Sequence, residues 1–133
     1  MELNGETLRF IREHCKDDVR SLALQAPKYP GVDMPVALTQ IAGRQAAAEK
    51  IPSWHEEEGV LYPRHLSLEQ CSSEATARYK ASIIPESSSG TLTDLTGGFG
   101  IDCAFLSPKF HHVTYVERQE VLCEIASHNF PLL

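Results

Sequence analysis

The sequence predicts an α/β fold in which an all-helical N-terminal module is followed by the beginning of a parallel β-α-β-α unit. Two observations predict this fold. Apolar residues recur at three- and four-residue steps through most of residues 5–84, as they do along amphipathic helices. After that point, short apolar runs alternate with helical patterns, and a glycine-rich stretch over 93–102 lies between the first run and the next helix.

Three helices are expected in the first part of the chain. Asn4 and the pair Asp17 and Asp18 each precede an apolar repeat, and their side chains suit the N-terminal cap of a helix. A third repeat begins at Asp33, where Pro35 suits the first helical turn. Pro27 ends the second helix, because proline cannot donate the backbone hydrogen bond that a helix interior needs. We therefore expect helices over 5–15, 19–26 and from 33 to near 52.

The stretch 51–63 is expected to be a loop, because prolines and a glycine interrupt it and three glutamates in a row form a solvated surface. Trp54 is expected to pin this loop to the helices by burying its ring. A fourth helix is expected over 67–84, with Ser67 as its cap and Gln70 closing a capping box.

The second half of the chain predicts two parallel strands, each followed by a helix. The expected elements are a strand over 91–95, a helix over 99–107, a strand over 113–116 and a helix over 119–129. This order is typical of a Rossmann-like unit, here truncated to its first two strands. We therefore divide the chain into a helical module (1–84), a linker (85–90) and the start of a ligand-binding domain (91–133).

The glycine-rich turn is the candidate ligand loop. Gly97, Gly98 and Gly100 lack side chains, so the backbone can adopt positive φ and approach a ligand closely. Asp94 and Glu117 lie at the carboxyl ends of the two strands, where parallel sheets bind ligands. An acidic residue about twenty positions beyond such a loop is suited to hold a ribose diol. The ligand is therefore expected to be a nucleoside.

The charges around the loop favour a cationic nucleoside over a dinucleotide. Asp94 and Asp102 would repel a pyrophosphate, and Cys103 stands where a dinucleotide loop has its third small residue. S-adenosylmethionine carries a sulfonium and an ammonium group that carboxylates favour, and its ribose suits Glu117. It is the cofactor that these residues favour.

These residues resemble the first motif of class I S-adenosylmethionine-dependent methyltransferases, with Thr96 in place of the first glycine. The stretches 40–44, 70–81 and 94–102 also resemble a narrower bacterial group of methyltransferases that carry a THUMP-like domain further along. The resemblance implies that Asp94 and the loop hold the methionine part and that Glu117 holds the ribose. It also places Phe99 and Arg118 in the pocket. The cofactor-binding residues implied in this way are Asp94, Thr96, Gly97, Gly98, Phe99, Gly100, Asp102, Glu117 and Arg118.

The family's catalytic motif follows a fourth strand, whereas we expect two strands in this chain. We therefore assign no catalytic residue. We expect this chain to be the N-terminal part of a longer enzyme and to be inactive alone. The resemblance also implies that the full-length enzyme acts on RNA. Two alternatives remain open: part of a nicotinamide or flavin dinucleotide enzyme, and a non-catalytic helical interaction module. The unpaired strand edges predict self-association that buries residues 113–133.

Composition limits the partners, the cellular compartment and the metal sites that we expect for this protein. The formal net charge of −6 gives no broad basic surface for nucleic acid, although Arg44, Lys50, Arg78 and Lys80 could face one locally. No apolar run approaches the length of a membrane span, and the N-terminus lacks the pattern of a secretory signal, so we expect a cytoplasmic protein without membrane contact. The four cysteines are widely spaced, without metal-ligand spacing, and we expect reduced, mostly buried thiols and no metal site.

Overall fold

The computed structural model describes residues 2–85 and 90–133 and combines helices with a two-stranded parallel sheet. The helices are α1 (Gly5–Glu13), α2 (Val19–Leu24), η1 (Ala26–Lys28), α3 (Met34–Lys50), α4 (Pro52–Glu56), α5 (His65–Gln70), α6 (Glu74–Ser82), α7 (Ile101–Leu106), η2 (Ser107–Lys109), α8 (Glu120–Asn129) and η3 (Phe130–Leu132). The strands are β1 (Thr91–Asp94) and β2 (His112–Tyr115). The predicted α/β character is confirmed, because α7 connects two parallel strands.

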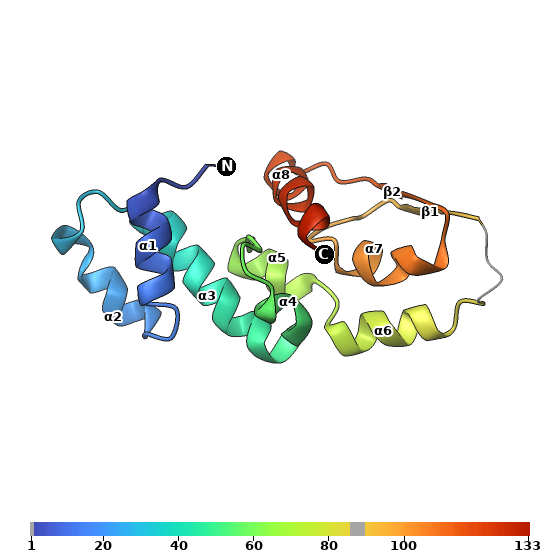
Figure 1. Ribbon diagram of the computed structural model, residues 1–133, viewed down its shortest axis with the longest axis horizontal. Coiled ribbons are helices and arrows are strands. Elements are labelled where there is room, and N and C mark those ends of the chain that lie inside the picture. The colour runs from blue at the N-terminus through green and yellow to red at the C-terminus, as the bar shows by residue number, and fades with distance from the viewer. Residues whose placement is uncertain (1, 86–89) are drawn as a thin grey trace.

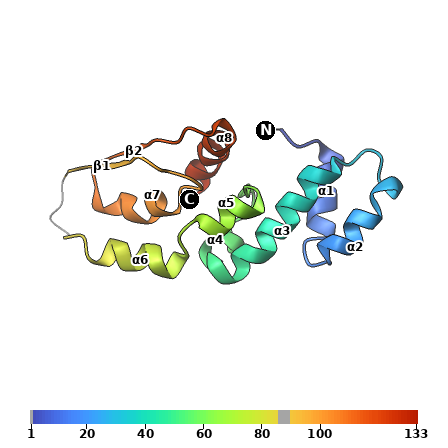
Figure 2. The ribbon, with the colours of Figure 1, turned by 180° about the vertical axis from the view of Figure 1, so that it is seen from behind.

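The molecule is elongated, with the first helices at one end and the sheet at the other (Figure 1). Helices α1, α2 and α3 pack together, and α4 and α5 follow between them and the sheet. Helix α7 lies between the sheet and α6 in both views (Figure 2). Among the helices of residues 2–85 and 90–133, none has the length and apolarity required to cross a bilayer.

The sheet has one covered face and one open face. Leu92 pairs in register with Val113, and both are half-buried on the side that α7 covers. The alternate positions are polar and exposed: Thr91, Thr93, His112 and Thr114. Because side chains alternate across a strand, this pattern gives a layered arrangement of sheet, α7 and α6.

Helices α1, α2 and α3 begin where the sequence predicts, and a polar side chain caps each of them. The Asn4 side chain accepts a hydrogen bond from the Thr7 N–H at 2.8 Å, and Asp18 accepts one from the Ser21 N–H at 3.1 Å. Asp33 caps α3 in the same way. These caps satisfy N–H groups that have no partner within the helix, which explains why the local signals sufficed.

The single helix predicted over 67–84 is wrong, because the chain forms α5 and α6 with a break at 71–73. Ser73, not Ser67, is the capping residue, and its hydroxyl accepts a hydrogen bond from the Thr76 N–H at 3.1 Å. The break also changes which side of α6 is buried. In α6, Ala77 is fully buried and Tyr79 is 68% exposed.

The expected loop over 51–63 contains a short helix, α4, which the sequence reading missed. Pro52 lies at its first position, where proline's missing N–H costs nothing. The prediction for Trp54 is confirmed, because this side chain is only 3% exposed and its ring meets Phe99 edge-to-face at 5.1 Å.

Apart from an apolar cluster among α1, α2 and α3, one apolar core of the described residues joins the middle helices to the glycine loop and α8. Its buried members are Ala47, Ile51, Trp54, Val60, Tyr62, Leu68, Ala77, Phe99, Ile101 and Ile125. They come from both sides of the linker predicted at 85–90, of which residues 86–89 lie outside the described part of the chain. The division into two modules stays a prediction, but helices from both parts bury their apolar faces together.

Two buried amide side chains fasten the extended segment between α4 and α5. Gln40 of α3 donates to the Tyr62 carbonyl at 2.9 Å and accepts from the Tyr62 N–H at 2.8 Å. Asn129 of α8 makes the same pair of bonds with Leu61, both at 2.8 Å. Because each amide satisfies both backbone groups of one residue, the segment is held between α3 and α8.

Candidate functional site

The glycine loop lies between the end of β1 and the start of α7, which confirms the predicted strand–loop–helix order. The Gly97 N–H donates to the Val116 carbonyl at 2.9 Å, so the loop is fastened to the residue that follows β2. Gly98 and Gly100 have positive φ values of 54° and 92°. Residues with a side chain rarely adopt this conformation, which explains glycine at these two positions.

Gly97 has a different reason to be glycine. Its φ is not positive, but a Cβ atom there would lie 2.2 Å from Cε2 of Tyr115. A Cβ atom at Gly100 would similarly lie 2.7 Å from the Phe130 ring. The two rings meet edge-to-face at 5.5 Å and form an aromatic floor beneath the loop. The close backbone approach expected toward a ligand is therefore, at these positions, an approach to Tyr115 and Phe130.

Glu117 is brought to the loop, as predicted for an acidic residue after the second strand. Its Oε2 accepts a hydrogen bond from the Gly98 N–H at 2.9 Å, and its Oε1 accepts one from the Gln119 N–H at 2.9 Å. These backbone donors lower the pKa of the Glu117 carboxyl. The side chain is therefore ionised at neutral pH, and each oxygen keeps a further lone pair that can accept from a hydroxyl.

Asp94 lies at the end of β1, also as predicted. Its Oδ1 accepts from the Thr96 N–H at 3.0 Å, which turns the chain into the loop, and Thr96 itself is exposed. The Cys103 thiol lies 3.6 Å from Oδ2 and donates to it. Burial, and after it the charge of Asp94, raise the pKa of Cys103 to about 12, so the thiol stays protonated. The Asp94 carboxylate is thus fixed from two sides.

Of the other predicted site residues, Phe99 and Asp102 have side chains that contact the helices rather than the loop. The Phe99 side chain is 1% exposed and packs against Trp54 and Tyr62, with its backbone alone in the loop. Asp102 accepts from the Lys80 ammonium at 3.0 Å, joining α7 to α6, and its Oδ1 is buried without a hydrogen-bond partner among the described residues. Arg118 is exposed beside Glu117.

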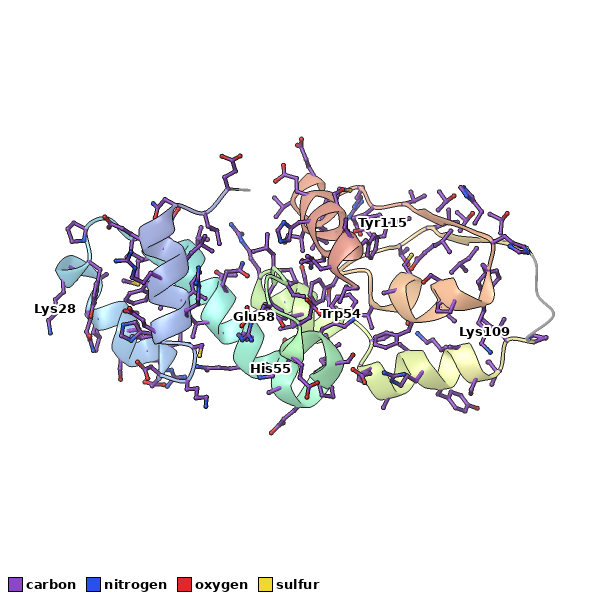
Figure 3. The ribbon with its side chains drawn as sticks, viewed as in Figure 1. Lys28, Trp54, His55, Glu58, Lys109 and Tyr115 are labelled. Carbon is purple, nitrogen blue, oxygen red and sulfur yellow. The ribbon has the colours of Figure 1, made fainter. Side chains whose placement is uncertain are left out.

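The sequence reading missed Tyr115, which the structure places at the centre of the loop's supports. Figure 3 shows it near α8, at the carboxyl end of the sheet. Its hydroxyl donates to the Gly98 carbonyl at 2.5 Å. Its position in the sequence could have predicted this placement. Tyr115 lies two residues after Val113 and two before Glu117, so alternation along β2 places it on the covered face of the sheet.

One solved structure resembles this chain over its whole length. It is described as the crystal structure of a "putative methyltransferase" from Porphyromonas gingivalis W83, with 30% sequence identity and a TM-score of 0.76. The match covers 100% of this chain and 33% of that one, so this chain spans about a third of the similar protein. The sequence matches no protein-family model and no curated protein.

An apolar groove of about 590 Å³ lies beside the sheet, on the side that α7 covers. It is lined by residues from α4, α7, β2 and the C-terminal turn: Ser53, Trp54, Glu57, Cys103, Ala104, Phe105, Ser107, Val113, Tyr115, Phe130, Leu132 and Leu133. In the described part of the chain, no three histidine, cysteine or acidic side chains gather where they could hold a metal ion. Asp94, Glu117 and the loop glycines are not among the residues that line this groove.

Proposed function

We propose that this chain supplies the S-adenosylmethionine-binding loop of a class I, Rossmann-like methyltransferase. The observation that carries the proposal is the Glu117 carboxylate, held by the Gly98 and Gln119 N–H groups with a lone pair left on each oxygen. Two such lone pairs suit the two hydroxyls of a ribose. The similar solved structure, described as a methyltransferase, supports the same reaction class.

The charges of the loop residues also suit the methionine part of S-adenosylmethionine. Asp94 and Glu117 give the loop two carboxylates, which attract the sulfonium and ammonium groups and disfavour a pyrophosphate. Moreover, the Gly98 N–H already donates to Glu117, so it is not free to bind a phosphate. When bound, S-adenosylmethionine would supply the methyl group, and this chain's residues would hold and orient it.

The finer parts of the proposal rest on resemblance. We propose that the chain forms the N-terminal part of a longer enzyme that also carries a THUMP-like domain, and that it does not transfer methyl groups alone. We propose RNA as the substrate of the full-length enzyme. Three of the four basic residues considered above for a local nucleic-acid contact already have partners: Lys50 donates to the Leu68 carbonyl, Arg78 pairs with Glu74, and Lys80 pairs with Asp102. An RNA-binding surface would therefore come mainly from the remainder of the enzyme.

The deciding experiment is calorimetry with S-adenosylhomocysteine on the full-length protein. We expect one binding site per protein, and we expect Glu117→Ala and Asp94→Ala each to weaken binding at least tenfold. Each variant removes a charged acceptor, which is typically worth about 1.5–3 kcal/mol. Arg9→Ala, in the distant helix α1, is the control. Binding of NAD⁺ in place of S-adenosylhomocysteine would favour a dinucleotide enzyme, and absence of binding to both would favour the interaction module.

We also propose that the 133-residue chain self-associates in isolation. The outer edges of β1 and β2 are unpaired among the described residues, and the apolar groove beside β2 includes Leu132 and Leu133. Unpaired edges and apolar grooves favour association between chains. Light scattering at increasing concentration tests this, with a dimer or larger species expected and a constant monomeric mass as the contrary result.

A further inference from the structure

The end of β2 holds both polar groups of a single loop residue, Gly98. The Gly98 N–H donates to Glu117 at 2.9 Å, and the Gly98 carbonyl accepts from the Tyr115 hydroxyl at 2.5 Å. Tyr115 and Glu117 are two residues apart, so one short segment reaches Gly98 from two sides. With φ at +54°, Gly98 is in a conformation that glycine leaves easily, and these two bonds select its orientation.

The Tyr115 hydroxyl is committed to this contact. It has one proton to donate, and its other acceptor, the Leu122 carbonyl, is farther away at 3.4 Å. Burial is the main reason that the pKa of Tyr115 is raised, so the proton stays on the oxygen. The ring itself lies against Gly97, in the space that a Cβ atom there would occupy. Ring and hydroxyl therefore act on neighbouring residues of the loop.

We propose that Tyr115 is a positioning residue for the nucleoside site, and this inference rests on the proposed function above. The carbonyl belongs to the Gly98–Phe99 peptide and the N–H belongs to the Gly97–Gly98 peptide, so the hydroxyl and Glu117 hold the two peptides on either side of the Gly98 Cα. Together they restrict φ and ψ of Gly98 and keep its N–H directed at the carboxylate that faces the ribose. Without the hydroxyl, the Gly98–Phe99 peptide can rotate, φ and ψ of Gly98 are no longer restricted from both sides, and the hydrogen bond from the Gly98 N–H to Glu117 is weakened. Tyr115 itself does not touch the ligand in this arrangement; it acts through Gly98 and Glu117.

The test is Tyr115→Phe in the full-length protein, because phenylalanine keeps the ring beneath Gly97 and removes only the hydroxyl. We expect S-adenosylhomocysteine to bind about threefold to tenfold more weakly, as the loss of one hydrogen bond implies. Hydrogen exchange at the Gly98 amide is expected to accelerate by a similar factor without any ligand. The matched control is Tyr62→Phe, which removes another buried hydroxyl that donates to a backbone carbonyl, that of Trp54 at 3.3 Å. This control is expected to leave binding unchanged.

A double-mutant cycle separates positioning from general support of the fold. If Tyr115 acts through Glu117, Tyr115→Phe is expected to change affinity by less than about twofold in a Glu117→Ala background. An equal loss of affinity with and without Glu117→Ala would overturn the inference. So would a Tyr115→Phe protein in which both the affinity and the hydrogen exchange of the Gly98 amide are unchanged. If the unmutated protein binds no S-adenosylhomocysteine, the proposed function fails and this inference fails with it. If the unmutated protein binds and Tyr115→Phe binds equally well, only the inference fails.

Discussion

Gly97→Ala tests whether the loop's glycines are required by the aromatic floor beneath them. The added Cβ would lie 2.2 Å from Cε2 and 2.4 Å from Cδ2 of Tyr115. Carbon atoms in favourable contact are about 3.5 Å apart, so the ring would have to retreat by about 1.3 Å. Phe130 packs against the ring at 5.5 Å between centroids and limits that movement. Overpacking of this kind typically costs about 1–3 kcal/mol, and we expect a loss near 2 kcal/mol.

The assay is equilibrium unfolding in urea with two control glycines. Gly5→Ala places its Cβ where nothing lies within 4 Å, and we expect a change below about 0.5 kcal/mol. Gly98→Ala has open space, with its nearest atom 3.7 Å away, but its positive φ should cost about 1–2 kcal/mol. In a Tyr115→Ala background the cost of Gly97→Ala should largely vanish, because the clashing ring is gone. A Gly97→Ala protein as stable as the unmutated chain would refute the argument that the Tyr115 ring requires glycine at position 97.

Three further predictions follow from single contacts. Asn129→Ala leaves both backbone groups of Leu61 without their partner, and urea unfolding should show a loss of about 2–4 kcal/mol; a loss below 1 kcal/mol would contradict the clamp. Cys103 should be alkylated far more slowly at neutral pH than the half-buried Cys15, as mass spectrometry of the labelled protein can show, because burial and the raised pKa keep its thiol neutral. The Glu117 carboxyl has its pKa lowered from 4.5, so its hydrogen bonds contribute fully above that pH and are lost as the pH falls through the folded-state value. The stability difference between the unmutated chain and Glu117→Gln should therefore be constant between pH 5 and 8 and shrink in more acidic urea titrations.

The parts of the fold governed by local chemistry could be predicted from the sequence. Asn4 and Asp18 cap their helices because a short polar side chain satisfies N–H groups within three residues. Asp94 and Glu117 were predicted to lie at the same edge of the sheet, because the carboxyl ends of parallel strands lie together. The break between α5 and α6 could not be predicted in this way, because the apolar repeat continues through it. At this break Ser73 caps the start of α6, and Lys80 of α6 forms an ion pair with Asp102 of α7, which is distant in the sequence.

The role of Phe99 shows why a motif alone did not define the site. In the sequence it stands between two loop glycines and reads as a residue that lines a pocket. In the structure its ring is buried between Trp54 and Tyr62, both from the helical half of the chain. The loop is therefore tied on two sides, to the helices by Phe99 and to the sheet by Tyr115. A glycine-rich backbone loses much conformational entropy when it is ordered, so both anchors are needed to hold the loop in one shape. It follows that the helical part is a structural support of the candidate site, in addition to any binding role of its own.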